Sequence, residues 1–274
     1  MYPHQIERLT EVLEREGLQA LVATSAANVR YVTGFGSMVH ALFRVARRVK
    51  SPYEIECLER ALHIAEEALN AVIQMLKPGV TEREAAAVFE SEVLKRDGAT
   101  YPSTIAMGEH AAIPAPWPSD RALRPGDLVR FDVGCVYKGF CSNVGRTGVM
   151  GEPDLRQQAV FDAVQAGLEA ALGAIAPGVP AARVFNAAIA ATRAGGLPEF
   201  QRHHVGHGIG LEHEEPPRLA SGVATPLEMG EVVRVEVPYY QHGWAGVNVK
   251  DTVLVTRREG HVMNRSLRGL VVLD

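Results

Sequence analysis

The chain has 274 residues, 47% of them hydrophobic, with a mean hydropathy of −0.01 and a formal net charge of −4. These values are typical of a globular protein with a sizeable core, and they favour neither nucleic acid nor an anionic membrane surface as a partner. No apolar run reaches the ~18 residues of a membrane span, and the charged start does not resemble a secretory signal. The three widely spaced cysteines do not form a disulfide framework, so we expect free thiols and a cytoplasmic location.

The first 50 residues differ from the rest of the chain. Residues 4–16 have the pattern of a helix, residues 18–24 that of a strand, and residues 27–35 that of a turn with a short helix. A segment with one or two strands cannot bury a core of its own, so it must dock on the rest of the chain or on another subunit. The apolar stretches 18–24 and 37–43 predict a homodimer.

Two helical pairs follow, about a hundred residues apart. The first helix, within residues 52–77, opens with the capping-box sequence Ser-Pro-Tyr-Glu. The second helix opens with Thr81 and Glu84, which repeat the capping pattern, and ends at Gly98. Residues 161–196 repeat this arrangement of two helices.

Segments rich in β-formers come after each helical pair. They are residues 103–108, 127–147, 231–240 and 246–256. Two α-α-β-β units predict a pseudo-symmetric α+β domain in which two sheet halves pack beneath four helices.

One basic residue lies in the last of these segments. Residues 246–256 are rich in valine, which suits a packed, pleated surface, but Lys250 lies among the valines. Because burial of an unpaired ammonium is costly, we expect Lys250 to face a negatively charged partner.

Four separated stretches, in chain order, resemble the pita-bread family of methionine aminopeptidases, Xaa-Pro aminopeptidases, prolidases and creatinase. They are residues 131–147, 203–212, 236–238 and 249–256. The resemblance implies the pseudo-symmetric pita-bread α+β fold, and residues 1–35 resemble the beginning of the amino-terminal domain of prolidases and creatinase. We therefore expect a truncated amino-terminal α/β segment at residues 1–48 and a pita-bread catalytic-type domain at residues 49–274.

Peptidases of this family bind two divalent metals with two Asp, one His and two Glu. The resemblance places these ligands, in order, on Asp132, Asn143, His207, Glu236 and Lys250. Asparagine thus stands in place of the second aspartate, and lysine in place of the metal-bridging glutamate. The intervals match those of the family, so a misalignment does not account for either change.

Two further positions depart from the family pattern. Ala115 follows Pro114, where the family often has histidine. The proton-shuttling histidine of the peptidases corresponds to Glu214, with His213 one residue earlier. A one-residue deletion would bring His213 into that role.

These changes predict a site without metal or other cofactor. Asp132 and Glu236 carry two negative charges and a protonated Lys250 carries one positive charge, so the expected net charge is −1. A dication about 4 Å from an ammonium is repelled by roughly 8 kcal/mol at an effective dielectric constant of 20. Two alternatives remain open: one ion bound by Asp132, His207 and Glu236, or a Lys250 side chain that reaches the surface.

The leading hypothesis is a metal-independent enzyme, creatinase-like in its site, that acts on a C–N bond of a small amino-acid-like substrate. The alternatives are an inactive pseudo-peptidase that serves as a binding module, and a mononuclear metallopeptidase or Xaa-Pro dipeptidase. The candidate catalytic residues, chosen for acid–base chemistry, are His207, His213, Glu236 and Lys250. The candidate substrate-binding residues are Asp132, Asn143, His203, His204, Glu215 and Tyr240.

Overall fold

The structure, a computed structural model, describes residues 3–17 and 45–274. The predicted strand at residues 18–24, the short helix within residues 27–35 and the apolar stretch at residues 37–43 lie outside the described residues. The helices are α1 (Pro3–Arg15), α4 (Pro52–Met75), α5 (Glu82–Leu94), η1 (Gly108–Ala112, a 3-10 helix), α6 (Leu155–Gly173) and α7 (Ala181–Ala194).

Side-chain caps determine where the helices of the main domain begin. The capping boxes predicted at residues 51–54 and 81–84 both form, at the starts of α4 and α5. Helix α6 begins directly after Asp154, upstream of the predicted start at Phe161. The reason is that Asp154 and Gln157 form a further capping box, which satisfies the amide groups of this earlier turn.

A large central sheet has the strand order β2-β3-β6-β12-β9-β7-β8, with β13 paired to β12 and β14 paired to β6. Its strands are β2 (Thr104–Met107), β3 (Leu128–Val133), β6 (Val144–Met150), β7 (Gly206–Gly208), β8 (Glu215–Arg218), β9 (Val232–Glu236), β12 (Lys250–Val255), β13 (Gly260–Val262) and β14 (Val271–Leu273). Three short strands form a second sheet: β1 (Ala99–Thr100), β4 (Cys135–Tyr137) and β5 (Phe140–Cys141). A separate hairpin consists of β10 (Tyr239–Gln241) and β11 (Ala245–Val247).

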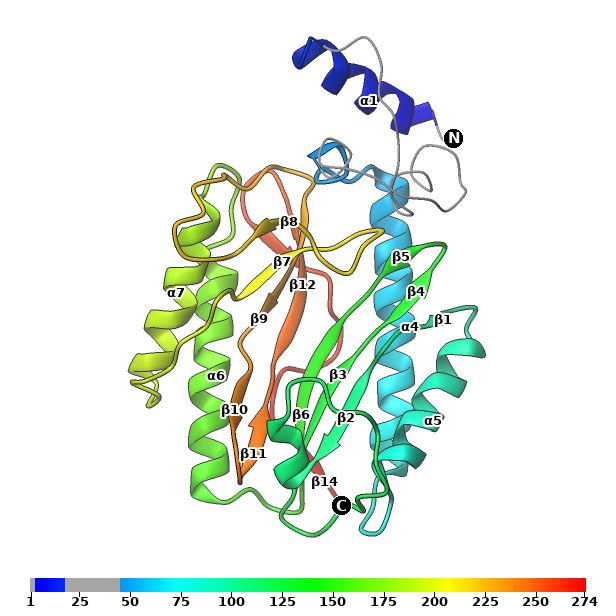
Figure 1. Cartoon of the computed structure of the whole chain (residues 1–274), viewed down its shortest axis with the longest axis vertical. Helices are drawn as coiled ribbons and strands as arrows, with labels where there is room; N and C mark the ends of the chain where they lie inside the picture. The colour runs from blue at the N-terminus through cyan, green and yellow to red at the C-terminus, as the bar shows by residue number, and fades with distance from the viewer. Residues whose placement is uncertain (1–2, 18–44) are drawn as a thin grey trace.

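The two helical pairs cover two halves of the central sheet, as predicted. Figure 1 shows α6 and α7 along one side of the sheet and α4 and α5 along the other. One hydrophobic core joins α4 and α5 to the first half through residues such as Leu62, Phe89 and Phe131. A second core joins α6 to the other half through residues such as Val164 and Val233. The pseudo-symmetric α+β fold is therefore confirmed.

The cysteines match the expectation from their spacing. Cys57, Cys135 and Cys141 are all buried, and none of them is in a disulfide bond. Burial raises the pKa of the Cys135 thiol to about 11, so it is protonated at neutral pH.

No helix in the described part of the chain combines the length and the apolar character that a membrane span requires.

Candidate functional site

Four neighbouring strands bring the residues singled out in the sequence into one row. The register pairs Asp132 of β3 with Gly145 of β6, Gly145 with Lys250 of β12, and Lys250 with Glu236 of β9. Directly paired residues point to the same face of a sheet, so the side chains of the row converge. A Cβ atom at Gly145 would lie 2.3 Å from Lys250 Cγ. The glycine therefore leaves the space through which the lysine crosses β6 to reach β3.

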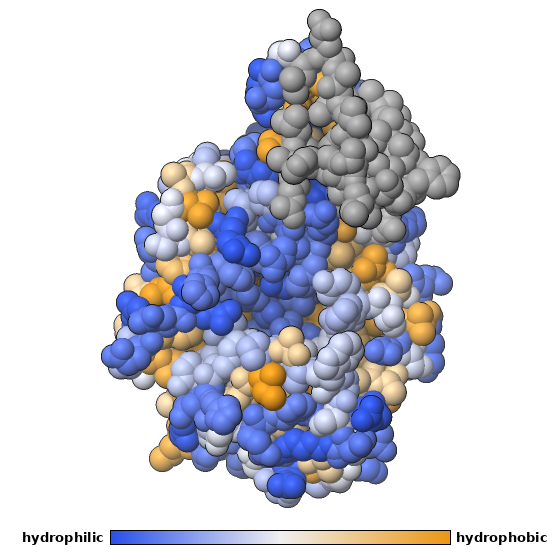
Figure 2. Space-filling model, in the orientation of Figure 1, coloured by the Kyte–Doolittle hydropathy of each residue, from blue (hydrophilic) through white to orange (hydrophobic). Residues whose placement is uncertain are grey.

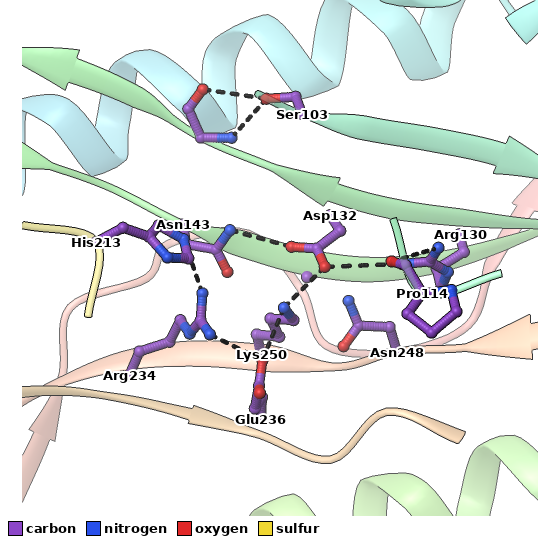
Figure 3. Close-up of polar contacts among 12 residues, drawn as sticks. Ser103, Pro114, Arg130, Asp132, Asn143, His213, Arg234, Glu236, Asn248 and Lys250 are labelled. Carbon is purple, nitrogen blue, oxygen red and sulfur yellow. Dashed lines mark hydrogen bonds and ion pairs between the residues drawn. The ribbon is translucent and has the colours of Figure 1, made fainter. Parts of the chain in front are cut away.

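Lys250 donates to both carboxylates of this row. Its Nζ lies 2.8 Å from Asp132 Oδ2 and 2.7 Å from Glu236 Oε2, and the lysine side chain is only 5% exposed. Asn143 Nδ2 donates to the other oxygen of Asp132 at 3.0 Å, and Figure 3 shows these groups facing one another. The alternative of a Lys250 side chain that reaches the surface is wrong.

Arg234 is a member of the site that the sequence analysis missed. Its Nη2 donates to His207 Nε2 at 2.7 Å and lies 3.1 Å from Glu236 Oε2. Its Nη1 donates to His213 Nε2 at 2.9 Å. The register pairs His207 of β7 with Arg234 of β9, which places this guanidinium between the two histidines and the carboxylate.

Arg130 is the second residue that was missed. It is fully buried, donates to three backbone carbonyls within residues 111–114, and places Nη1 3.7 Å from Asp132 Oδ2. The alternation of side chains along a strand could have identified both arginines from the sequence. Arg130 lies two residues before Asp132 and Arg234 two residues before Glu236, so each shares a face with its carboxylate.

Together Arg130, Asp132, Arg234, Glu236 and Lys250 form what we call the charge cluster. It holds three cations and two carboxylates, so its net charge is +1 rather than the expected −1. Burial by itself raises the pKa values of Asp132 and Glu236. The charges of Lys250 and Arg234 outweigh burial and hold both pKa values below the usual range. Both carboxylates are therefore ionised at neutral pH.

The histidines beside the charge cluster are neutral acceptors. His207 Nδ1 donates to the Gly208 carbonyl at 2.8 Å, which leaves the Nε2 lone pair for Arg234. Burial, with the nearby Arg234 charge, lowers the pKa of His207 to about 2 and that of His213 to about 4. The His213 ring stacks on Tyr101 with centroids 5.0 Å apart, which holds the plane of the imidazole.

His204 and Tyr240, both predicted to bind substrate, border the charge cluster. His204 Nδ1 lies 3.7 Å from Glu236 Oε1, and burial lowers the pKa of this histidine. The guanidinium carbon of Arg130 lies 5.1 Å from the centre of the Tyr240 ring. That distance is within the range of a cation–π contact.

The other two predicted substrate-binding residues differ from His204 and Tyr240: one is exposed to solvent, and the other forms ion pairs outside the charge cluster. His203 is exposed. Glu215 is buried, with Oε2 2.8 Å from Lys50 Nζ and Oε1 3.3 Å from Arg47 Nε. Its carboxylate thus joins β8 to the segment that precedes α4.

A group of possible metal ligands lies beside Arg234. His207, His213 and Glu214 each offer one ligand atom, and these atoms lie within 4.8 Å of one another. His207 and Glu214 also line a cavity of about 220 Å³. In the view of Figure 2, hydrophilic residues gather over the middle of the molecule, with hydrophobic residues scattered around them.

Comparison with known families gives two matches. Residues 56–257 match the model of metallopeptidase family M24. Residues 5–73 match the model of the creatinase/prolidase amino-terminal domain.

Individual relatives and solved structures agree with these matches. An uncharacterized peptidase of Staphylococcus saprophyticus is 34% identical over 241 residues, which are 87% of this chain and 67% of that protein. A prolidase from Pyrococcus furiosus superposes with a TM-score of 0.80 at 31% identity, covering 83% of this chain and 68% of its own. An Xaa-Pro dipeptidase from Bacillus anthracis has a TM-score of 0.83 at 27% identity, covering 98% and 78%.

The family match corrects the leading functional hypothesis. A model of metallopeptidases covers most of the chain, which contradicts a metal-independent enzyme, and the structure contains a group of side chains that could hold an ion. The relation to enzymes that cleave C–N bonds agrees with the prediction, because the matched relatives are peptidases. The chain has the pita-bread fold and belongs to metallopeptidase family M24.

Proposed function

We propose that this chain is an Xaa-Pro dipeptidase that works with a single divalent ion. The prolidase and the Xaa-Pro dipeptidase that superpose on the chain support the substrate class. The observation that carries the proposal is the set of His207, His213 and Glu214, whose ligand atoms lie within 4.8 Å of one another beside the charge cluster.

A two-ion centre does not fit the carboxylates of the row. Lys250 Nζ lies within 2.8 Å of both Asp132 and Glu236, where an ion would have to bind. Arg234 lies 3.1 Å from Glu236 as well. At an effective dielectric constant of 20, an ammonium repels a dication about 4 Å away by roughly 8 kcal/mol. The amide of Asn143 is also a weaker ligand than the expected carboxylate.

A single ion fits the set of His207, His213 and Glu214 better than two ions fit the carboxylates of the row. Two histidines and a carboxylate form a donor set typical of zinc hydrolases. The Nε2 lone pairs of His207 and His213 already point to one place, where Arg234 occupies both of them. An ion at that place therefore competes with the guanidinium of Arg234, which would keep Glu236 as its partner. This set replaces the Asp132, His207 and Glu236 set considered from the sequence.

The side chains of the site suit the hydrolysis of a short peptide. An ion held by this set would supply polarisation of the peptide carbonyl. The hydrogen bond from His207 Nδ1 to Gly208 and the stacking of Tyr101 on His213 keep the two imidazoles oriented. Glu214 is about half exposed, so its carboxylate stands at the opening toward solvent.

The test is hydrolysis of glycyl-L-proline by chain depleted of metal on chelating resin and then supplied with Mn²⁺, Co²⁺ or Zn²⁺. We expect turnover with at least one ion. His213→Ala and Glu214→Gln each remove a direct ligand, so each should lose at least the roughly ten- to a hundredfold in metal affinity or activity that the loss of an outer-shell partner costs. The matched control is His261→Ala, an exposed histidine on β13, which should leave turnover unchanged. Absence of turnover with all three ions would refute the proposal.

A binding module is the second candidate, favoured by a specific observation. Lys250 and Arg234 neutralise the carboxylates to which the metallopeptidases' ions would bind. A chain of this kind would bind a peptide without cleaving it. Binding of glycyl-L-proline without turnover is the result that distinguishes this candidate.

We further propose a homodimer in a reducing, cytoplasmic compartment, with no nucleic acid as a partner. The burial of all three cysteines, without a disulfide bond between them, supports the compartment. The division into residues 1–48 and 49–274 also stays a prediction, because residues 18–44 lie outside the described part.

A further inference from the structure

The loop that joins β7 to β8 carries His213 and Glu214, two of the three proposed ion ligands, and it ends at a buried carboxylate. This carboxylate belongs to Glu215, the first residue of β8, whose side chain is 0% exposed. The Glu212 backbone N–H donates to Glu215 Oε1 at 3.2 Å, and a Cβ atom at Gly210 would lie 2.6 Å from Oε2. The loop is therefore folded closely around the Glu215 carboxylate.

The backbone at the two ligands has no hydrogen bonds that fix its path. Among the described residues, neither the N–H nor the carbonyl groups of His213 and Glu214 take part in a hydrogen bond. Their side chains do have partners: Arg234 and the Tyr101 ring contact His213, and Arg218 donates to Glu214 at 3.2 Å. The path of the loop itself therefore depends on the residues that flank the two ligands.

Two cations from a distant part of the chain hold these flanking residues. Lys50 Nζ lies 2.8 Å from Glu215 Oε2, and Arg47 Nε lies 3.3 Å from Glu215 Oε1. Arg47 Nη2 also lies 3.0 Å from Glu212 Oε2, so one guanidinium bridges the glutamates on both sides of His213. Each of the two cationic side chains is only 2% exposed. Loss of either cation would leave a buried carboxylate without a counter-charge it now has, which is costly.

The segment that supplies the two cations is itself fixed to the main domain. The Lys50 N–H donates to the Gly230 carbonyl at 2.8 Å, and Lys50 Nζ also donates to the Arg47 carbonyl at 2.5 Å. Arg48, between them, pairs with the buried Glu231 at 2.5 Å. Figure 1 shows β8 at the end of the sheet where α4 begins. The cations are therefore anchored independently of the loop that they hold.

We propose that Arg47 and Lys50 are positioning residues, which hold the loop between β7 and β8 in the conformation that gives His213 its place in the proposed ion site. Each acts through the buried Glu215 carboxylate rather than on the substrate. The role deepens the proposed function and rests on it, because the loop carries ligands of the proposed ion. It also links the segment at the predicted domain boundary to the site.

The first test observes His213 in the metal-depleted chain, by two-dimensional NMR of protein labelled with 15N-histidine. The spectrum of His213→Gln identifies the His213 ring signal. We expect Arg47→Met and Lys50→Met to shift this signal, because the ring moves relative to the arginine and the tyrosine that contact it. Arg48→Met is the matched control, since it removes an ion pair of the same segment with the buried Glu231, and it should leave the signal in place. An unchanged His213 signal in both test variants would overturn the proposal.

The second test measures the affinity for Co²⁺, titrated into the metal-depleted chain and followed by the visible absorption of the bound ion. We expect Lys50→Met to bind Co²⁺ about tenfold more weakly, the lower end of the loss that follows removal of an outer-shell partner. Arg48→Met should bind as the unmodified chain does, although both variants lower the melting temperature. Equal weakening in the two variants would assign the effect to general stability and would overturn the proposal.

Arg47→Lys keeps the proposal testable where the methionine variants fail to fold. The substitution retains a cation beside the buried Glu215, but a compact ammonium does not reproduce the planar fork that meets two carboxylates at once. We expect a folded chain in which the His213 signal is shifted and Co²⁺ binding is weakened. A folded Arg47→Lys chain with the normal His213 signal and normal Co²⁺ affinity would overturn the role of Arg47.

The positioning role and the proposed function fail in different ways. If the His213 signal responds to Lys50→Met but the unmodified chain binds no ion, the proposed function fails and the positioning role stands. If the chain hydrolyses glycyl-L-proline with one ion, yet Lys50→Met leaves the His213 signal and the Co²⁺ affinity unchanged, the positioning role alone fails.

Discussion

Lys250 lies in a valine-rich strand, yet its ammonium pairs with two carboxylates. Its ammonium joins Asp132 and Glu236 from two strands that do not pair with each other, and it is almost inaccessible to solvent. Arg234 adds a second cation on Glu236. In the dinuclear peptidases that the sequence resembles, metal ions lie beside these carboxylates. Here positive side chains take those positions.

Removal of the Lys250 charge should destabilise the fold in a pH-dependent way. Lys250 contributes to holding the pKa values of Asp132 and Glu236 below those of the unfolded chain. This stabilisation is present above pH ~4 and is lost as the pH falls through the folded-state pKa values. We expect Lys250→Met to cost a few kcal/mol at pH 8, the order found when one partner of a buried pair is removed.

At pH 5 the difference from the unmodified chain should be smaller, because burial raises the pKa values of carboxylates that have lost one of their cations. Denaturant melts at both pH values measure the effect. Lys77→Met, at an exposed lysine, is the control and should leave stability unchanged at either pH. Equal, near-normal stability of Lys250→Met at pH 5 and pH 8 would contradict the assigned ion pairs.

At the scale of secondary-structure elements, the register of β3, β6, β12 and β9 determines which side chains meet. The cross-strand row passes through Gly145, the position where any side chain would collide with Lys250. The glycine is therefore required by a contact between elements rather than by its own backbone.

Gly145→Ala should accordingly destabilise the chain by about 1–3 kcal/mol, the usual cost of overpacking. Gly173→Ala is the control, since a Cβ there meets nothing within 4 Å. The cost should shrink in a Lys250→Ala background, because the two positions share one contact. Additive effects in this double-mutant cycle, measured by denaturant unfolding, would rule out the contact.

The difference between local and long-range information explains what could be predicted from the sequence. The capping boxes at residues 51–54 and 81–84 are local, and both helices begin there. Lys250 was connected to Asp132 and Glu236 only through the family resemblance, because strand order is not a local property. Arg130 and Arg234 were within reach of the alternation rule, but both are charged residues in strands read as apolar. The side-chain amide of Asn248 has no hydrogen-bond partner among the described residues. This depends on packing and has no sequence signal.

At the scale of the whole molecule, the amino-terminal segment bears on assembly. Residues 5–73 match the creatinase/prolidase amino-terminal domain, yet the apolar stretches that predict a subunit contact lie outside the described residues. We expect a dimer with twice the chain mass of 29.7 kDa. Light scattering at micromolar concentration measures the mass, and a monomer under these conditions would refute the prediction.

The central claim is that side-chain cations leave room for one metal ion per chain, at His207, His213 and Glu214. Elemental analysis after equilibration with Mn²⁺ or Zn²⁺ and dialysis tests this claim most directly. We predict one ion per chain, and about tenfold or greater tightening in Arg234→Met, because the guanidinium no longer occupies the two imidazole lone pairs. Two ions per chain, or none, would contradict the claim.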